Sequence, residues 1–174
     1  PEHAVPGPYG LPELIVDPSG RTQRDRLHGA ARIAVPGCYP TGSLLALAPA
    51  LAVGVVEPAD LVVVAASGTS GAGKSVKPHL LGAETMGSMS PYGVGGGHRH
   101  TPEIEQGLGW AGGTEVSLSF TPTLAPMPRG ILTTATAVLR PGVDEARVRE
   151  VYRAAYAHEP FVHLLPEGQW PATQ

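Results

Sequence analysis

Two segments in the second half of the chain, residues 115–121 and 130–139, are predicted to be strands with no helix between them. In the first segment apolar residues alternate with polar ones, which indicates a strand with one buried face. A further strand, rich in β-branched residues, is predicted over residues 60–66. Strands that follow one another without a helix favour antiparallel pairing. We therefore expect an α+β fold in which a mixed, largely antiparallel sheet carries its helices on one face.

Helical patterns flank these strands. Residues 41–53 predict a mostly buried helix with a kink at Pro49. A second helix is predicted to begin with Thr101 as its cap and Pro102 in the first helical position. Asp144 is expected to cap a third helix. The apolar stripe of this third helix comprises Val148, Val151, Tyr152 and Ala155.

The remaining segments are rich in turn-forming residues, since the chain holds 23 Gly and 19 Pro. Residues 1–30 are expected to form an irregular arm, residues 32–35 a short strand, and residues 161–165 the last apolar element. The chain has 174 residues, enough to bury the core of one domain. We therefore expect residues 1–174 to form a single domain.

Charge and hydropathy argue against two classes of partner. The net charge is −3, and no cluster of Lys and Arg is dense enough for a nucleic-acid face. The longest apolar run, residues 43–56, is too short to span a bilayer and contains Pro49 and Gly54. No signal peptide is recognised, and a single Cys fits a reducing compartment. We expect a cytoplasmic protein that binds neither nucleic acid nor membrane.

A glycine-rich loop follows the strand predicted over residues 60–66 and matches the phosphate-loop pattern of nucleotide triphosphatases. Gly68 and the run Gly73-Lys74-Ser75 have the spacing G-x-x-x-x-G-K-S. The context does not fit, because Pro78 would interrupt the helix that must follow, and no later strand ends in an Asp that could hold magnesium. The N–H groups of such a loop can still form a concave anion site. Anion binding and a purely structural turn both stay open.

The only cysteine, Cys38, lies ahead of a predicted helix in the sequence AVPGCYPTG. A helix N-terminus favours the thiolate, which is the nucleophilic form of the side chain. The surrounding Pro and Gly indicate an exposed bend rather than a core position. His98 and His100 flank Arg99 ahead of another predicted helix. Because a His close to a thiol can take up its proton and later return it, Cys38 and this pair are candidates for nucleophilic catalysis.

Other interpretations of these residues stay open. Cys38 could be an inert buried residue, and the His pair could be polar surface without a role. A metal site would need His79 or His163 as a further ligand. Because no CxxC or HExxH pattern is present, we expect no metal.

Five segments together resemble the catalytic and dimerisation domain of the N-acetyl-gamma-glutamyl-phosphate reductase family, in the group of aspartate-semialdehyde and glyceraldehyde-phosphate dehydrogenases. They occur in the family's order and span nearly the whole chain: YGLPEL (9–14), VPGCYPTG (35–42), SGTSGAGK (67–74), HRHTPEIEQ (98–106) and FTPTLAPMPRGILTT (120–134). The chain departs from the family at Lys74, where an Arg is usual, and at Thr123, where a His is common. Family members also carry a nucleotide-binding Rossmann domain, and the resemblance implies that this domain is absent from this chain.

The resemblance implies a fold like the C-terminal domain of glyceraldehyde-3-phosphate dehydrogenase. It implies NADPH-dependent reduction of N-acetyl-L-glutamyl 5-phosphate to N-acetyl-L-glutamate 5-semialdehyde in arginine biosynthesis, through a thioester on Cys38 and with release of phosphate. His98 or His100 would be the acid–base. The expected substrate contacts are Arg99, Ser67 and Gly68, and the expected cofactor contacts are Gly71, Ala72, Gly73 and Lys74. The expected partners are the substrate, the protein's own nucleotide-binding domain, and further copies of the chain in a homo-dimer or tetramer.

Two other functions stay open at this point. The chain could be a non-catalytic oligomerisation and ligand-binding domain, or a stand-alone cysteine hydrolase, although no acid that would orient the His pair is evident. Because most of the cofactor site lies in the missing Rossmann domain, we expect the isolated chain not to catalyse the NADPH-dependent reduction.

Overall fold

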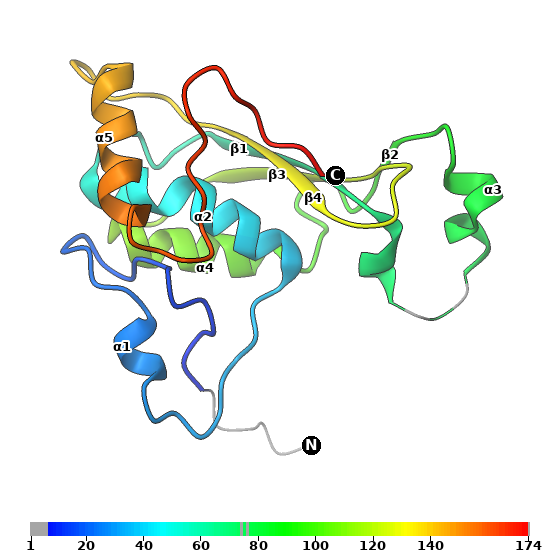
Figure 1. Ribbon diagram of the computed structural model, residues 1–174, viewed down its shortest axis with the longest axis horizontal. Coiled ribbons are helices and arrows are strands. Elements are labelled where there is room, and N and C mark those ends of the chain that lie inside the picture. Colours follow the sequence, from blue (N-terminus) through cyan, green and yellow to red (C-terminus); the bar gives the residue numbers. More distant parts are fainter. Residues whose placement is uncertain (1–6, 74, 76, 174) are drawn as a thin grey trace.

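The computed structural model describes residues 7–73, 75 and 77–173, and a four-stranded sheet forms the centre of this part of the chain (Figure 1). The strands are β1 (Leu61–Ser67), β2 (Ser90–Pro91), β3 (Leu118–Leu124) and β4 (Ile131–Thr136). Their order is β2-β3-β1-β4, with β1 and β3 parallel and the other two pairs antiparallel. The expectation of an α+β fold with a mixed sheet is confirmed.

The two strands predicted to follow one another, β3 and β4, lie on either side of β1 instead of pairing with each other. A parallel pair needs a crossover connection, and the chain makes it between β1 and β3 through the helix α4 (Thr101–Gly112). β3 also begins at Leu118 rather than at residue 115. Ser117, just before it, instead bonds to the turn ahead of β1, where its Oγ accepts from the Asp60 N–H at 2.7 Å.

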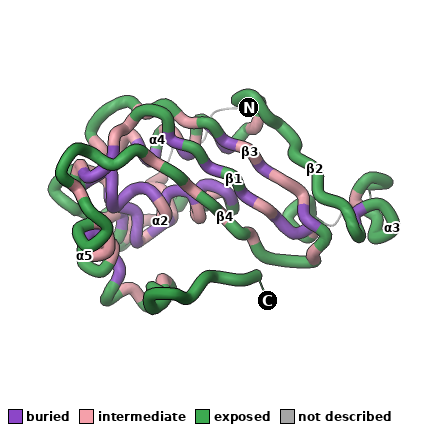
Figure 2. Tube along the Cα trace, turned by 90° about the horizontal axis from the view of Figure 1, so that it is seen from above, coloured by how far each residue is buried: buried purple, intermediate pink, exposed green. Residues whose placement is uncertain are grey.

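Helices cover one face of the sheet and leave the other open (Figure 1, Figure 2). The long helix α2 (Cys38–Val53) and α4 lie under the sheet, and α5 (Glu145–Tyr156) packs at the end of α2. In β1 the side chains that point to the helices, Leu61, Val63 and Ala65, are fully buried. The alternate residues Val62 and Val64 stay 38% and 42% exposed on the open face. The prediction of helices on one face is therefore confirmed.

Helices α2 and α4 run side by side with their N-termini at the same end. Gly107 of α4 lies against Leu44 of α2, so closely that a Cβ at Gly107 would come within 2.6 Å of a Leu44 methyl group. Further along the two helices, toward their C-termini, Gly112 faces Leu51. Since Leu44 and Gly107 are each six residues from the start of their helices, Cys38 and Thr101 begin their helices next to each other.

Pro49 lies inside α2, where its ring removes the N–H that would bond to the carbonyl of Leu45. Helix α5 supplies the missing partner: the Tyr156 hydroxyl donates to the Leu45 carbonyl at 2.8 Å. The Tyr152 hydroxyl donates to the next carbonyl, that of Ala46. The helix predicted over residues 41–53 thus continues through Pro49, because a neighbouring helix donates hydrogen bonds to the carbonyls of Leu45 and Ala46.

Several local predictions need correction. Residues 32–35 form no strand, only a single bridge between Ala34 and Tyr9, because the described residues of the arm offer no second extended segment of matching length. Residues 161–165 form no regular element. The helix α4 begins one residue earlier than expected, with His100 rather than Thr101 at the N-cap. Asp144 caps α5 as predicted, by accepting from the Arg147 N–H at 2.8 Å. Apart from α1 (Arg24–Leu27), the described residues ahead of α2 form no helix or strand.

Between β1 and α4 the chain projects beyond the sheet (Figure 1). The projecting segment carries two 3₁₀ turns, η1 (Thr69–Ala72) and η2 (Pro78–Leu80), the single-turn helix α3 (Gly82–Thr85) and β2. Among the described residues after Gly73, no helix exceeds four residues until α4, so the phosphate-loop pattern lacks the helix that a triphosphatase needs. No helix in the described part of the chain has the length and hydropathy needed to cross a membrane.

Candidate active site

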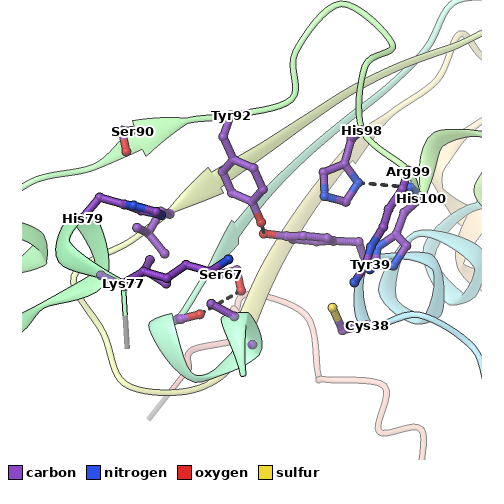
Figure 3. Close-up of a pocket in the computed structure, with 15 residues that line it drawn as sticks. Cys38, Tyr39, Ser67, Lys77, His79, Ser90, Tyr92, His98, Arg99 and His100 are labelled. Carbon is purple, nitrogen blue, oxygen red and sulfur yellow. Dashed lines mark hydrogen bonds between the residues drawn. The ribbon is translucent and has the colours of Figure 1, made fainter. Parts of the chain in front are cut away.

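A pocket of about 490 Å³ opens where the first turns of α2 and α4 meet the end of β1 and the projecting segment (Figure 3). It brings together eight of the residues predicted from sequence. These are Cys38, Ser67, Gly68, Gly71, Ala72, His98, Arg99 and His100. Gly73 does not line the pocket, and Lys74 lies outside the described residues. Residues far apart in the sequence therefore share one cavity, with the only thiol at its edge.

Cys38 is the first residue of α2, and its side chain is exposed. The sequence placed it just ahead of the helix, and the structure places it in the first turn, where the positive end of the helix dipole faces the sulfur. Gly37 occupies the N-cap position without any side chain to bond the free N–H groups. A small, unshielded turn therefore presents the thiol to the pocket.

His98 and His100 lie with their ring centroids 4.9 Å apart. The backbone N–H of His100 donates to Nδ1 of His98 at 3.1 Å, so a neutral His98 carries its proton on Nε2. Burial lowers the pKa of His98 below its ordinary value of 6.5, and the neighbouring His100 and Arg99 lower it further. Burial also lowers the pKa of His100, in concert with Arg99 and against the opposing charge of Glu103. Both imidazoles are therefore mainly neutral at pH 7, as a proton acceptor must be.

The ring of His100 packs directly on the turn that bears the thiol. A Cβ at Gly37 would lie 2.6 Å from Nε2 of His100, closer than real Cβ contacts come. Only glycine allows this approach. Gly37, in the sequence PGC, is thus needed for packing, because its lack of a side chain lets the His100 imidazole lie directly beside the residue that precedes Cys38.

Aromatic side chains that the sequence analysis did not single out form the floor of the pocket. Tyr39 makes edge contacts with His98 at 5.5 Å and with Phe120 at 5.3 Å between ring centroids. The hydroxyls of Tyr39 and Tyr92 are hydrogen-bonded to each other (Figure 3). Burial and this bond raise the pKa of Tyr92 above its ordinary value, which keeps it a neutral hydroxyl. Tyr39 adjoins Cys38 in the sequence, but nothing local indicates that Tyr92 joins it.

The first N–H groups of the glycine loop after β1 are taken up by the backbone of the segment between β3 and β4. The N–H groups of Gly68, Thr69 and Ser70 donate to the carbonyls of Gly130, Met127 and Pro128. A Cβ at Gly68 would lie within 2.7 Å of the Arg129 backbone, so this glycine is required for packing. The cations that line the pocket in the described residues are Arg99 and Lys77, and Figure 3 shows the Lys77 side chain extending toward Ser67. Lys77 was missed because no motif includes it.

The described residues contain no group of three or more His, Cys, Asp and Glu side chains that could hold a metal ion. His79 lines the pocket on the wall formed by η2, opposite the His98–His100 pair in Figure 3. The pocket thus combines the Cys38 thiol, the neutral imidazoles of His98 and His100, the imidazole of His79, and the cations Arg99 and Lys77.

Comparison with known proteins identifies the family of the chain. Residues 38–174 match the family described as semialdehyde dehydrogenase, dimerisation domain. The N-acetyl-gamma-glutamyl-phosphate reductase of Micrococcus luteus is 71% identical over 172 residues, which are 99% of this chain and 48% of that protein. The proteins of the same name from an Arthrobacter species and from Streptomyces coelicolor are 67% and 66% identical, again over 48% of their length. The chain thus spans about half the length of these curated relatives.

Among solved structures, a probable aspartate-semialdehyde dehydrogenase from Pseudomonas aeruginosa has a similar fold. The TM-score is 0.63 at 18% sequence identity, and the match covers 99% of this chain and 55% of the other. At this identity the likeness shows a shared fold and no more.

Proposed function

Because the chain belongs to the family of semialdehyde dehydrogenase dimerisation domains, we propose that it is the catalytic and dimerisation half of an N-acetyl-gamma-glutamyl-phosphate reductase. The enzyme would convert N-acetyl-L-glutamyl 5-phosphate and NADPH to N-acetyl-L-glutamate 5-semialdehyde, phosphate and NADP. The names of the relatives support this substrate. The observation that carries the chemistry is the pocket in which Cys38 shares a cavity with the His98–Arg99–His100 run.

The Cys38 sulfur is the proposed nucleophile. The thiolate attacks the acyl carbon of the phosphate anhydride, a C–S bond forms, the C–O bond to phosphate breaks, and phosphate leaves with the electron pair. The product is a thioester on Cys38, a carbonyl that accepts hydride as a carboxylate does not. After reduction the C–S bond breaks, so Cys38 leaves as the thiolate and the aldehyde is released.

His98 and His100 are the proposed acid–base groups. Being mainly neutral at pH 7, either can take the thiol proton. His98 carries its proton on Nε2, because its Nδ1 accepts from the backbone. It can therefore also donate a hydrogen bond to the acyl or phosphate oxygen. Arg99 would hold the substrate's carboxylate or phosphate with two N–H groups. Ser67 and Gly68 would be further contacts of the same substrate.

The pocket wall at the glycine loop is the proposed contact surface for a nicotinamide nucleotide. Among the described residues, a Cβ at Gly71 would meet only Ser67 Oγ, at 3.7 Å, and Gly71 lines the pocket. We propose that Gly71, Ala72, Gly73 and Lys74 contact the cofactor, with Lys77 as a further cation. When bound, NADPH would supply the hydride that reduces the thioester. A nucleotide-binding domain in the longer protein would hold the rest of the cofactor, and we place the enzyme in the cytoplasm as a homo-dimer or tetramer.

The experiment that tests the proposal is mass spectrometry of the chain after incubation with N-acetyl-L-glutamyl 5-phosphate and acid quenching. We expect the mass of an N-acetylglutamyl group on Cys38 and one phosphate released per acylated chain. The matched control is Cys38→Ala, which should gain no mass. Binding of the substrate without a thioester would overturn the proposal in favour of a non-catalytic ligand-binding domain. Repeated release of N-acetylglutamate by the chain alone would instead indicate a cysteine hydrolase.

A further inference from the structure

The structure assigns to Glu103 the role of a positioning residue that holds the Cys38 turn against His100. This inference rests on the proposed function, since it concerns the same nucleophile. Oε1 of Glu103 accepts two hydrogen bonds at once, from the backbone N–H of Gly37 at 2.9 Å and from the Tyr9 hydroxyl at 2.6 Å. One carboxylate oxygen thereby joins the arm, the first turn of α2 and the first turn of α4.

The place of Glu103 in α4 makes this use unusual. His100 is the N-cap of α4, so Glu103 is the third helical residue, and a glutamate there commonly bonds back to the N-cap N–H of its own helix. Here the His100 N–H donates to His98 Nδ1 instead. The carboxylate is therefore free to reach the neighbouring helix, while it remains at the favourable positive end of α4.

The hydrogen bond from Gly37 to Glu103 affects the Cys38 thiol and the His100 imidazole indirectly, through the residues next to them. Gly37 precedes Cys38 directly, and its Cα faces the His100 ring so closely that a Cβ would lie 2.6 Å from Nε2. Since Glu103 belongs to the same helical turn as His100, it fixes how far the thiol-bearing turn can move from the imidazole. Glu103 itself does not line the pocket, so it does not touch a substrate there.

Tyr9 completes the arrangement from the arm. Its ring packs edge-on against Trp110 of α4 at 6.1 Å between centroids. Burial and the hydrogen bond to Glu103 raise the pKa of Tyr9 above its ordinary value, so the hydroxyl stays a donor. The arm is anchored next to it, where Gly10 donates to the Ala34 carbonyl at 2.8 Å. Glu103 thus receives one donor from a fixed aromatic residue and one from the turn it positions.

The test is the rate at which iodoacetamide alkylates Cys38 in the chain, compared with the rate of thioester formation. Glu103→Ala should slow both about tenfold, because it releases the turn. Glu103→Gln keeps an acceptor oxygen for both donors and should stay within about twofold of the wild type, whereas Tyr9→Phe should lose about threefold. The matched control is Glu105→Ala on the same helix, whose carboxylate has no hydrogen bond or ion pair among the described residues and should alkylate at the wild-type rate.

Thermal unfolding of each variant separates positioning from stability. The inference is overturned if Glu103→Ala alkylates as fast as the wild type, or if Glu103→Gln is as slow as Glu103→Ala, since charge rather than hydrogen bonding would then be responsible. Should Glu103→Ala fail to fold, the alkylation rates of Tyr9→Phe and Glu103→Gln decide. A slow Tyr9→Phe variant together with a Glu103→Gln variant at the wild-type rate supports the role. A Tyr9→Phe variant at the wild-type rate together with a slow Glu103→Gln variant overturns it. A wild-type chain that forms no thioester would refute the proposed function. The alkylation rates of the variants would still test the positioning role of Glu103.

Discussion

At the scale of single residues, the pocket depends on imidazoles that are kept neutral. The pKa of His98 and of His100 is lowered in the fold relative to the ordinary value of 6.5, chiefly by burial and with a contribution from Arg99. We expect both histidines to titrate below pH 6.5 in an NMR titration of their ring protons. In Arg99→Gln both midpoints should move up toward 6.5, because the neighbouring positive charge is gone.

The same shifts determine how stability depends on pH. An unfolded chain takes up protons on these histidines near pH 6.5, whereas the folded chain takes them up only at lower pH. The stability that the neutral forms contribute is therefore complete above pH 6.5 and is lost as the pH falls toward the lowered pKa values. Midpoints at or above 6.5 for both residues would contradict this assignment.

Gly37 gives a second prediction at this scale. Its φ of −68° and ψ of 157° suit any residue, so alanine would not strain the backbone. The added methyl would, however, lie 2.6 Å from His100 Nε2 and push the ring away. We expect Gly37→Ala to slow thioester formation about tenfold, measured by quenched mass spectrometry, with little change in thermal stability. Gly82→Ala is the control, because a Cβ there meets no described residue within 4 Å; equal rates in the two variants would refute the packing argument.

The sequence predicted part of this site and could not predict the rest. Cys38, the His98–His100 pair and the loop residues were found because their types and spacing carry recognisable chemistry. Tyr92 was not, because it reaches Tyr39 only through the folding of the projecting segment. Glu103 lies in a pattern that predicts helix capping, and only the tertiary structure shows its hydrogen bond to a different helix.

At the scale of elements, the pairing of α2 with α5 explains how a buried helix tolerates a proline. Tyr156 supplies the hydrogen bond that Pro49 denies to the Leu45 carbonyl. We expect Tyr156→Phe to lower the free energy of unfolding by about 1–3 kcal/mol, because that carbonyl is left buried without a donor. Urea denaturation measures the loss.

A double-mutant cycle isolates this coupling. In Pro49→Ala the backbone N–H of residue 49 can bond the Leu45 carbonyl, so removing the Tyr156 hydroxyl should then cost much less. If Tyr156→Phe costs the same with proline and with alanine at position 49, the hydroxyl does not compensate for the proline. The cycle also corrects for the cavity that Pro49→Ala leaves, because that cavity is present in Pro49→Ala both with and without the Tyr156→Phe substitution.

Elements were predicted better than their arrangement. Apolar patterns located strands in the regions of β3 and β4, and the cap Asp144 with its apolar stripe located the helix α5. It could not show that β1 would insert between β3 and β4, because periodicity describes one segment's faces and not its partners. The parallel pair depends instead on the crossover through α4, a long-range contact that no local pattern encodes.

At the scale of the whole molecule, the open face of the sheet exposes apolar side chains such as Val62, Val64 and Leu132 that another protein surface could cover. It is formed by residues that alternate with the buried ones: Val62, Val64, Ala66, Ser119, Thr121, Thr123, Leu132, Thr134 and Thr136. None of these side chains carries a charge, and six of the nine are β-branched. The family's description as a dimerisation domain supports a second copy of the chain as the partner that covers this face.

This assignment gives the last prediction. Val64 lies in the middle of the open face and is 42% exposed, so a glutamate there would leave the helix-covered core untouched but would bring a charge from each subunit into the interface. We expect the wild-type chain to sediment as a dimer or larger oligomer and Val64→Glu to shift toward the monomer, with unchanged far-ultraviolet circular dichroism. Val35→Glu, on the arm and 85% exposed, is the matched control and should keep the wild-type assembly. A monomeric wild type, or a Val64→Glu variant that assembles like Val35→Glu, would show that the open sheet face is not the interface between subunits.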